Sequence, residues 1–452
     1  MILLSINRIR SERRIKSLNN SLQNPTEHKS SMKLNQTSEY QHIKREYYQY
    51  TPSRKYSTRI VRFDNGETFN TRIYVGNIKN PNDPRESFDY AFLRKRKRGI
   101  LDAEFPKFFC VDLFSGCGGL SLGAREACLA VGRRFVPLLA IDKDSASQEV
   151  YKKNFKPLRS YRNDIWDIVD GQLSASYTTN EKAILEGLGE VDLLLAGPPC
   201  QGHSDLNNHT RREDERNALY ERVGRFAEIS APRHILIENV PNIIHSHEHV
   251  LESTMNVLVK CGYKVDTGVV SLEDIGIPQK RRRHVLVASL EKCVSITDVI
   301  EKHRISHPRD VRWAIGDLEC EKRKGGLTTP TDHTKENLLR IKYLFEHDLF
   351  DLPDHMRPAC HRNGHTYKAM YGRMKYDQPA QTVTSGFGSP GQGRYIHPSQ
   401  PRTITPHEAA RLQFFPDFFD FSSGVKRGSL AQMIGNAVPM KLSYVFCLEF
   451  LS

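Results

Sequence analysis

The sequence predicts an α/β protein: a doubly wound, Rossmann-like sheet with a smaller domain inserted near its end. From Phe108 onward, short apolar runs alternate with helix-like segments, which is the pattern of repeated βα units. Glycine-rich or polar motifs follow several of these runs, at the carboxyl edge where open α/β sheets bind their ligands. A chain of 452 residues is also long enough to hold two or three domains.

The first hundred residues carry most of the charge. The formal net charge of the whole chain is +13, and residues 1–100 hold 21 Lys and Arg against 9 Asp and Glu. Residues 1–55 are polar without a sustained period, so we expect a basic, disordered extension. Residues 56–105 are expected to form a small β module or a linker, because the alternation around Asn65-Gly66 predicts a hairpin. The basic start favours a polyanionic partner such as nucleic acid, although many basic tails are only solvated.

Residues 106–289 are expected to form the main domain, because they carry most of the strand-like and helix-like segments. Helices are predicted at Ser145–Asn154 and Asn217–Ile229, which lie between apolar runs. The candidate strands are Phe108–Phe114, Val136–Ile141, Val191–Ala196, His234–Ile237, Lys264–Ser271 and His284–Ala288.

The βα rhythm stops near residue 290. Residues 290–400 are irregular and rich in His, Gly and Pro, so we expect a second, inserted domain there. Residues 401–452 regain helical character at Thr405–Gln413 and Leu430–Leu451, which indicates that the chain returns to complete the main domain.

The cysteines and the hydropathy pattern exclude several classes of protein. The nine cysteines are scattered, with no C-x-x-C pair and an odd total, which argues against a disulfide framework and against a zinc site. No apolar run approaches the length of a membrane span. We therefore expect a protein of the reducing cytoplasm, with no membrane partner and no metal.

A glycine-rich turn, Asp112–Leu120 (DLFSGCGGL), joins the first predicted strand to the first helix. Glycines let a backbone pass close to a ligand, but many such loops are only turns. The spacing differs from the G-x-G-x-x-G and G-x-x-x-x-G-K-[ST] patterns, so pyrophosphate and triphosphate binding are disfavoured. Asp142 ends the next strand, a position from which an acid would hydrogen-bond the ribose of a bound nucleoside. Asp164 would offer a carboxylate to the amino group of an adenine. Each of these two residues, taken alone, would also be an ordinary aspartate of a turn or a helix cap. Together with the glycine loop, they indicate a nucleoside cofactor without phosphates.

The segment Gly197–Ser204 (GPPCQGHS) follows an apolar run and sets Cys200 at the carboxyl edge of the predicted sheet. A cysteine there is either a nucleophile or a buried, inert thiol. The motifs Glu238-Asn239-Val240 and Gln279-x-Arg281-x-Arg283 follow strand-like runs and would meet Cys200 at one edge. Their presence favours the nucleophile.

The ordered blocks DLFSGCGGLSLG, AIDKD, NDI, GPPCQG, ENV, IPQKRRRHVLVA, RTITPHEAARLQFFPDFF and IGNAVPMKL resemble the motifs of the DNA cytosine-C5 methyltransferases, of the bacterial, restriction-modification-like type. The resemblance runs from about Phe108 to the C-terminus. The irregular segment 290–400 is similar in position to the family's target recognition domain. The resemblance implies the methyltransferase form of the Rossmann-like fold and a cofactor, S-adenosyl-L-methionine.

The resemblance also assigns residues to the cofactor. It implies that Phe114 lies against the adenine, Asp142 on the ribose and Asp164 on the adenine amino group. The residues expected to line the cofactor site are Phe114, Gly116, Gly118, Gly119, Leu120, Asp142, Asp164, Pro199, Asn436 and Val438.

The implied chemistry is covalent. Cytosine C5 is too poor a nucleophile to attack a methyl sulfonium unaided, and addition of the Cys200 thiolate to C6 would turn C5 into an enamine carbon. Glu238 would hydrogen-bond the exocyclic amine and donate a proton towards N3. Arg281 and Arg283 would bind the O2 of the base and nearby phosphate or carboxylate groups, unless the run KRRRH is only solvated.

A base inside a duplex is out of reach of Cys200, so the target must be flipped out. The polar stretch 201–216 has the composition of a mobile loop that closes over the flipped base, and Arg211 and Arg212 would meet phosphates or simply face solvent. Gln279 is also expected to contact DNA. The expected partners of this monomeric enzyme are double-stranded DNA and a cognate restriction endonuclease.

Two residues depart from the family pattern: His203 stands where Phe is usual, and Lys143 stands where an apolar or aromatic residue often stacks on the adenine. Two other functions stay open. An RNA cytosine methyltransferase is disfavoured by the sizeable insert, and a non-catalytic DNA-binding regulator is disfavoured by the intact Cys200, Glu238 and arginines.

Overall fold

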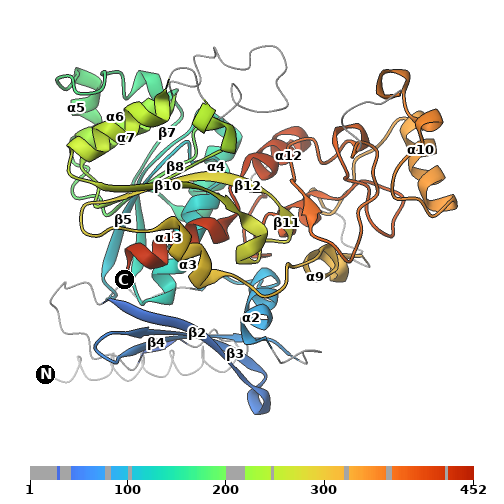
Figure 1. The fold of residues 1–452 in the computed structure, drawn as a ribbon, viewed down its shortest axis with the longest axis horizontal. Helices are drawn as coiled ribbons and strands as arrows, with labels where there is room; N and C mark the ends of the chain where they lie inside the picture. Colours follow the sequence, from blue (N-terminus) through green and yellow to red (C-terminus); the bar gives the residue numbers. More distant parts are fainter. Residues whose placement is uncertain are drawn as a thin grey trace, which may run out of the picture.

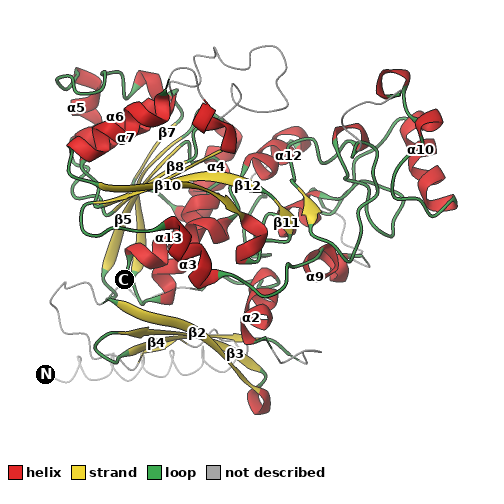
Figure 2. Ribbon diagram, in the orientation of Figure 1, coloured by secondary structure: helices red, strands yellow, loops and turns green. Residues whose placement is uncertain are grey.

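The computed structural model describes residues 28–30, 42–76, 83–99, 104–199, 219–245, 249–319, 325–362, 369–422 and 426–452. It consists of a central sheet with helices on both faces, a small N-terminal sheet below it, and a lobe to one side (Figures 1 and 2). None of the helices in these ranges is long and apolar enough to cross a membrane.

The central sheet confirms the α/β prediction. Its seven strands are ordered β10-β12-β9-β8-β5-β6-β7, and β5 runs parallel to both of its neighbours. The chain moves from β5 outward to β7 and then crosses to β8, so a topological switch point lies between β5 and β8. The strands are β5 (Lys107–Leu113), β6 (Arg134–Ile141), β7 (Arg159–Tyr161), β8 (Leu193–Ala196), β9 (His234–Asn239), β10 (Lys264–Ser271) and β12 (Arg282–Ser289).

Two features of the sheet were not part of the prediction. Strand β12 pairs antiparallel with both β9 and β10, so the sheet is not parallel throughout. Strand β7 lies in a polar segment of three residues that lacks an apolar run, because an edge strand buries little side-chain surface.

Successive side chains of each strand point to opposite faces of the sheet, and helices cover both faces. Cys110 of β5 joins the core under α3, α4 and α13, whereas Val111 and Leu113 join the core under α6 and α7. The helices are α3 (Gly119–Ala130), α4 (Ser145–Phe155), α5 (Thr179–Leu185), α6 (Leu219–Ser230), α7 (Val250–Lys260) and α13 (Met440–Phe450).

The N-terminal module is an antiparallel sheet of order β1-β4-β3-β2, and in the described part of the chain helix α2 packs against it. The hairpin predicted at Asn65-Gly66 is confirmed, and Gly66 has the positive φ of 87° that its turn requires. The boundary expected at residue 55 is wrong, because β2 lies before it and packs Tyr48 on Phe88 with ring centroids 5.4 Å apart. Such burial depends on distant partners that local composition does not show. The elements are β1 (His28–Ser30), β2 (Ile43–Thr51), β3 (Tyr56–Phe63), β4 (Thr68–Tyr74) and α2 (Pro84–Leu93).

Buried charges join this module to the main domain. Asp89 of α2 accepts a hydrogen bond from Lys441 of α13 and forms an ion pair of 2.5 Å with Arg309. Each of these three residues is at most 5% exposed. Glu46 of β2 accepts a hydrogen bond from the hydroxyl of Tyr444, also on α13. The module is therefore an integral part of the domain that carries α13.

The inserted domain is smaller than the predicted range 290–400. Helices α8 (Ile296–His303) and α9 (Val311–Ile315) contribute side chains to the main core. The separate lobe carries α10 (Lys335–Glu346) and has a small core of its own (Figure 1). That core consists of Ile341, Leu344, Leu352, Tyr371 and Ile396. A parallel pair, β11 (Gln279–Lys280) with β13 (Ala380–Gln381), links the lobe to the main domain.

The C-terminal segment returns to the main domain as predicted, but with a break. Helix α11 (Pro406–Leu412) begins at a capping box formed by Thr405 and Glu408. The expected run Leu430–Leu451 divides into α12 (Arg427–Asn436) and α13, because Pro439 has no N–H group to continue the helix.

The replacement Asp89→Asn should destabilise the protein by about 3–5 kcal/mol, because it leaves Lys441 and Arg309 as uncompensated buried charges. Urea unfolding followed by circular dichroism measures this loss.

The double variant Asp89→Asn with Lys441→Met should lose less than Asp89→Asn alone, since it removes one of the stranded cations. Lys153→Gln is a control, because it breaks the exposed ion pair with Asp420 and should barely move the midpoint. A wild-type midpoint for Asp89→Asn would contradict the integral role of the N-terminal module.

Candidate active site

The glycine loop leaves the carboxyl end of β5 and enters α3. Phe114 and Gly116 have positive φ angles of 55° and 52°, and Gly118 caps α3 at φ 97°. A Cβ on Gly118 would crowd the rings of Tyr151 and Phe155. Only glycine adopts this angle in so tight a space, which keeps the loop backbone close to the sheet edge.

Two further glycines bring α3 against α13. A Cβ on Gly119 would overlap the carbonyl oxygen of Val438, and one on Gly123 would overlap that of Met440. Ser443 donates a hydrogen bond of 2.7 Å to the carbonyl of Leu120. The predicted cofactor residues Gly119, Leu120 and Val438 therefore meet, although more than 300 positions separate them in the sequence. Asn436 lies exposed at the end of α12, two residues before Val438.

Asp142 holds the glycine loop in place. Its carboxylate accepts hydrogen bonds of 2.8 Å from the backbone N–H groups of Gly116 and Asp144. Burial raises the pKa of Asp142, although both N–H donors favour the charged form. The acid expected to bind a ribose thus also shapes the loop beside it.

Lys143, one of the departures from the family pattern, lies beside the acid expected at the adenine. Its ammonium is 3.4 Å from Asp164 Oδ2, and the two side chains are 64% and 39% exposed. Asp164 caps a short 3-10 helix (Ile165–Asp167) by accepting from the N–H of Trp166. An exposed pair of this kind contributes little stability, so both groups can exchange this contact for a ligand.

Asp112 is a residue that the sequence analysis quoted but did not assign. It is 1% exposed beneath the glycine loop, and Ser121 of α3 donates to its Oδ2 at 2.6 Å. Burial raises the pKa of Asp112 to about 7, against the opposing effect of the Ser121 hydrogen bond. The loop therefore rests on a carboxyl group that titrates near neutrality.

Glu238 and Arg283 form a partly buried ion pair at the sheet edge. Arg283 Nε lies 2.6 Å from Glu238 Oε1, and the two side chains are only 14% and 9% exposed. A Cβ on Gly197, at the end of β8, would lie 3.8 Å from Glu238 Oε2 and within 4 Å of Leu120 and Val438 side chains. Five motifs of the sequence thus converge at the carboxyl ends of β8 and β9.

Cys200 itself, with His203, Arg211 and Arg212, lies outside the described residues. Pro199, the last residue described before it, is half-buried and directly follows the turn after β8. The structure therefore describes the approach to Cys200 from Gly197 to Pro199.

Gln279 does not fit the predicted contact with DNA. Its side chain is completely buried, its amide donates to Leu412 and Gln413, and its Oε1 accepts from the N–H of Val383. Because the side chain has no exposed surface and its amide nitrogen and oxygen both have hydrogen-bond partners, it cannot contact a DNA duplex. It joins the inserted lobe to the C-terminal helices instead.

Arg281 also differs from its predicted role. The guanidinium is buried and donates to the carbonyl oxygens of Val383, Gly435 and Ala437 at 3.0–3.5 Å. These contacts fix the end of α12, just before Val438. We therefore assign Arg281 to positioning, and only Arg283 of the two arginines reaches Glu238.

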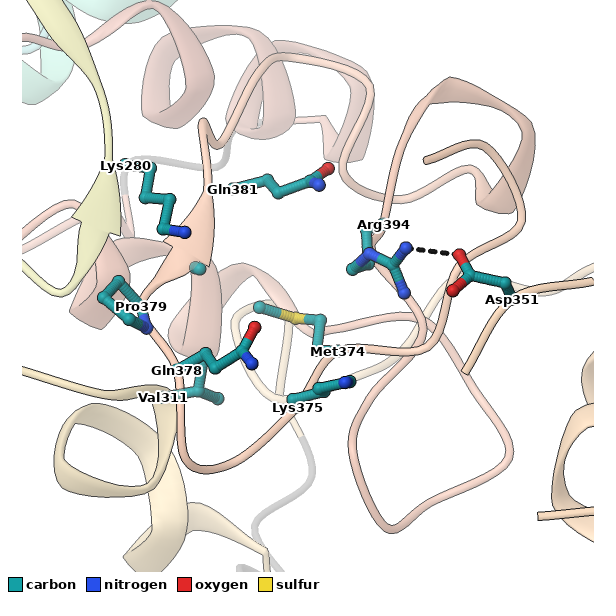
Figure 3. Close-up of a pocket in the computed structure, with 10 residues that line it drawn as sticks. Lys280, Val311, Asp351, Met374, Lys375, Gln378, Pro379, Gln381 and Arg394 are labelled. Carbon is teal, nitrogen blue, oxygen red and sulfur yellow. Dashed lines mark hydrogen bonds and ion pairs between the residues drawn. The ribbon is translucent and has the colours of Figure 1, made fainter. Parts of the chain in front are cut away.

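Lys280 is a surface residue that sequence reasoning missed. It is exposed, whereas its neighbours Gln279 and Arg281 are buried. It pairs with Gln381 across β11 and β13, and its side chain faces a cavity of about 210 Å³ (Figure 3). The alternation in Gln279–Arg283 was the signal that could have found it. The cavity is lined by Lys280, Val311, Asp351, Met374, Lys375, Gln378, Pro379, Ala380, Gln381 and Arg394.

No group of three or more metal-ligating side chains occurs in the ranges that the structure describes. The seven cysteines of these ranges are all free. The site therefore consists of backbone amides, carboxyl groups and guanidinium groups at one sheet edge.

The replacement Asp112→Asn should change how stability depends on pH. An unfolded aspartate loses its proton near pH 4, whereas Asp112 keeps its proton to about pH 7. Between these values the unfolded chain binds fewer protons, so the free energy of unfolding falls as the pH rises. Asp112→Asn should lack this fall, as urea unfolding from about pH 4 to pH 8 can measure.

Ser121→Ala provides the matched test, because it removes a hydrogen bond that lowers the Asp112 pKa. Its stability should go on falling at higher pH than that of the wild type. Parallel pH profiles for Asp112→Asn and the wild type would contradict the assignment.

Comparison with known proteins agrees with this geometry. A model of the C-5 cytosine-specific DNA methylase family matches residues 108–449. Type II methyltransferase M1.BsuMI of Bacillus subtilis is 46% identical over 365 residues, which cover 80% of this chain and 85% of that protein. Type II methylase M.HgiDII of Herpetosiphon aurantiacus is 32% identical, with coverage of 74% and 92%.

Solved structures share the fold. The S. pombe Dnmt2 methyltransferase superposes with a TM-score of 0.54 at 21% identity, covering 76% of this chain and 98% of its own. A prophage-encoded DNA modification methyltransferase of E. coli gives 0.55 at 24% identity, with coverage of 76% and 98%. The chain thus belongs to the C-5 cytosine-specific DNA methylase family and is an S-adenosylmethionine-dependent DNA cytosine-5 methyltransferase.

Proposed function

We propose that this enzyme methylates one cytosine of a specific DNA site through a covalent bond between Cys200 and C6 of the flipped base. The observation that carries the proposal is the Glu238–Arg283 pair, which lies beside Gly197, three residues before Cys200. A base that enters this edge meets a carboxyl group, a fixed cation and the turn that carries the thiol.

The residues divide the chemistry between them. The Cys200 thiolate adds to C6, and the electron pair of the C5–C6 double bond moves towards N3, where Glu238 donates a proton. Arg283 orients Glu238 and offers its remaining N–H groups to the O2 of the base. C5 then takes the methyl group and loses its own proton to a base, N3 returns its proton to Glu238, and the C6–S bond breaks to restore the aromatic ring and the thiolate.

The cofactor residues fit a nucleoside with a sulfonium chain. S-adenosylmethionine supplies an electrophilic methyl group when it is bound. The glycine loop leaves backbone close to the sheet edge, Asp142 reaches this loop, and Val438 closes over Gly119. We assign Phe114, Asp142 and Asp164 to the adenosine and Leu120, Pro199, Asn436 and Val438 to the walls of the pocket.

DNA would lie between the main domain and the inserted lobe. Lys280 and Lys375 line the cavity at this junction, and neither forms an ion pair with another described residue. Their charges suit phosphates, which position a duplex without reading its sequence. We further assign phosphate contacts to Arg211 and Arg212, and base readout to the lobe around α10.

The biological setting follows from the relatives. Both relatives named above are Type II enzymes, so we propose that this chain is a cytoplasmic monomer that protects DNA from a restriction endonuclease of the same specificity. Sequencing of methylated genomic DNA from an expressing cell would identify the site. Resistance of that DNA to cleavage would identify the endonuclease.

The replacement Cys200→Ser should abolish methyl transfer and leave S-adenosylmethionine binding nearly unchanged, because the hydroxyl is a far weaker nucleophile at C6. A duplex that carries 5-fluorocytosine should trap the wild-type enzyme covalently, since fluorine cannot leave C5 as a proton does. Denaturing electrophoresis detects the adduct. An adduct that persists in Cys200→Ser would refute the assignment.

The replacement Gly119→Ala should weaken S-adenosylmethionine binding by about tenfold or more, because its Cβ pushes the Val438 carbonyl away from α3. Isothermal titration measures the affinity. Gly428→Ala in α12 is the matched control, since no atom lies within 4 Å of its Cβ. If both variants bind like the wild type, the contact between α3 and Val438 does not shape the pocket.

A further inference from the structure

The outer face of the N-terminal sheet carries an arginine cluster. Arg45 of β2 lies directly opposite Arg62 of β3, and Arg72 of β4 lies opposite Thr58. Because alternate residues of a strand share a face, Thr58 and Arg62 place all three arginines on one side of the sheet. We call Arg45, Arg62 and Arg72 the outer arginines.

The outer arginines lack partners among the described residues. Arg45 and Arg62 are exposed and Arg72 is half-buried, and none of them forms an ion pair or a hydrogen bond with another described residue. Strands β2, β3 and β4 place no carboxylate on this face. Like charges directly opposite each other destabilise a sheet, so the Arg45–Arg62 pair costs free energy unless an anion neutralises it.

The opposite face of the sheet is buried against the main domain. It carries Arg59, which donates to the Tyr444 hydroxyl at 3.1 Å, and the core residues Val61 and Phe69. The outer arginines therefore belong to the face opposite the one that packs against the main domain, and Figure 1 shows the N-terminal sheet lying below α3 and α13. The outer arginines lie away from the cavity between the main domain and the inserted lobe.

Uncharged donors surround the outer arginines. Tyr47 and Gln49 lie on the same face of β2, with Arg45 stacked over the Tyr47 ring at 5.9 Å. Tyr74 is 51% exposed at the end of β4. Guanidinium, phenol and amide groups together donate hydrogen bonds to phosphate oxygens, which accept several at once.

We propose that this face binds the phosphate backbone of double-stranded DNA outside the catalytic cleft. The proposal builds on the DNA substrate of the enzyme and adds a second contact that does not read sequence. Charge complementarity carries it: three cations share a face on which the described strands β2, β3 and β4 place no acid, in a segment whose first hundred residues hold 21 basic against 9 acidic residues. Such a contact raises the residence of the enzyme on long DNA.

The test replaces all three outer arginines with Gln in the full-length enzyme. Binding to a long duplex should weaken, and the plot of log affinity against log salt concentration should become less steep by up to about 2.7, since each phosphate contact contributes about 0.9. Binding to a duplex that only fills the catalytic cleft should not change. The site methylated and the rate at saturating DNA should also stay as in the wild type.

A matched control removes three cations elsewhere. Lys156, Lys182 and Lys260 are exposed on the main domain and have no ion pair with another described residue, so their triple Gln variant should keep the wild-type salt dependence on long DNA. Circular dichroism checks that both variants fold, which exposed substitutions should permit.

Three results would overturn the proposal. One is an unchanged salt dependence of the arginine variant on long DNA. Another is an equal loss in the lysine control, which would reflect net charge alone. The third is a changed sedimentation coefficient of the free arginine variant, which would assign the face to a second copy of the chain. Loss of the covalent 5-fluorocytosine adduct would contradict the role proposed for Cys200 and would not affect the proposal for this face.

Discussion

The close backbone contact between α3 and α13 is the constraint on which the rest of the structure depends. Gly119 and Gly123 let the two helices approach until backbone meets backbone at Val438 and Met440. This approach places the C-terminal turn over the glycine loop, and it fixes α13 where the N-terminal module binds. A single methyl group at Gly119 would act on the cofactor pocket and on this helix pair together.

Buried polar side chains extend this constraint to the inserted lobe. Gln279 and Arg281 form hydrogen bonds with the backbone of Val383, and Arg281 also binds the carbonyl of Ala437 after α12. Two residues of one motif thus hold the lobe and the C-terminal helices to the main domain. Arg283, two positions further on, reaches Glu238. The short stretch Gln279–Arg283 thus both holds the parts together and supplies the arginine that pairs with Glu238, and its alternation decides which residue does which.

Much of the fold and of the cofactor loop could be predicted from the sequence, because apolar runs and glycine spacing are local signals. The strand Lys264–Ser271 was predicted with its observed bounds. The roles of Gln279 and Lys280 could not be assigned from the motif, because they depend on a pairing with Ala380 and Gln381 a hundred residues away. The strand β2 was missed for the same reason, since its Tyr48 packs against Phe88 of α2, forty positions later.

The buried link between the two chain ends has a consequence for synthesis on the ribosome. Glu46 and Asp89 find their partners Tyr444 and Lys441 about 350 to 400 positions later. The N-terminal module must therefore wait, with Glu46, Asp89 and one face of its sheet uncovered, until α13 has left the ribosome. Nascent chains cannot complete the pocket, so a prematurely terminated polypeptide would be inert towards the cell's own genome.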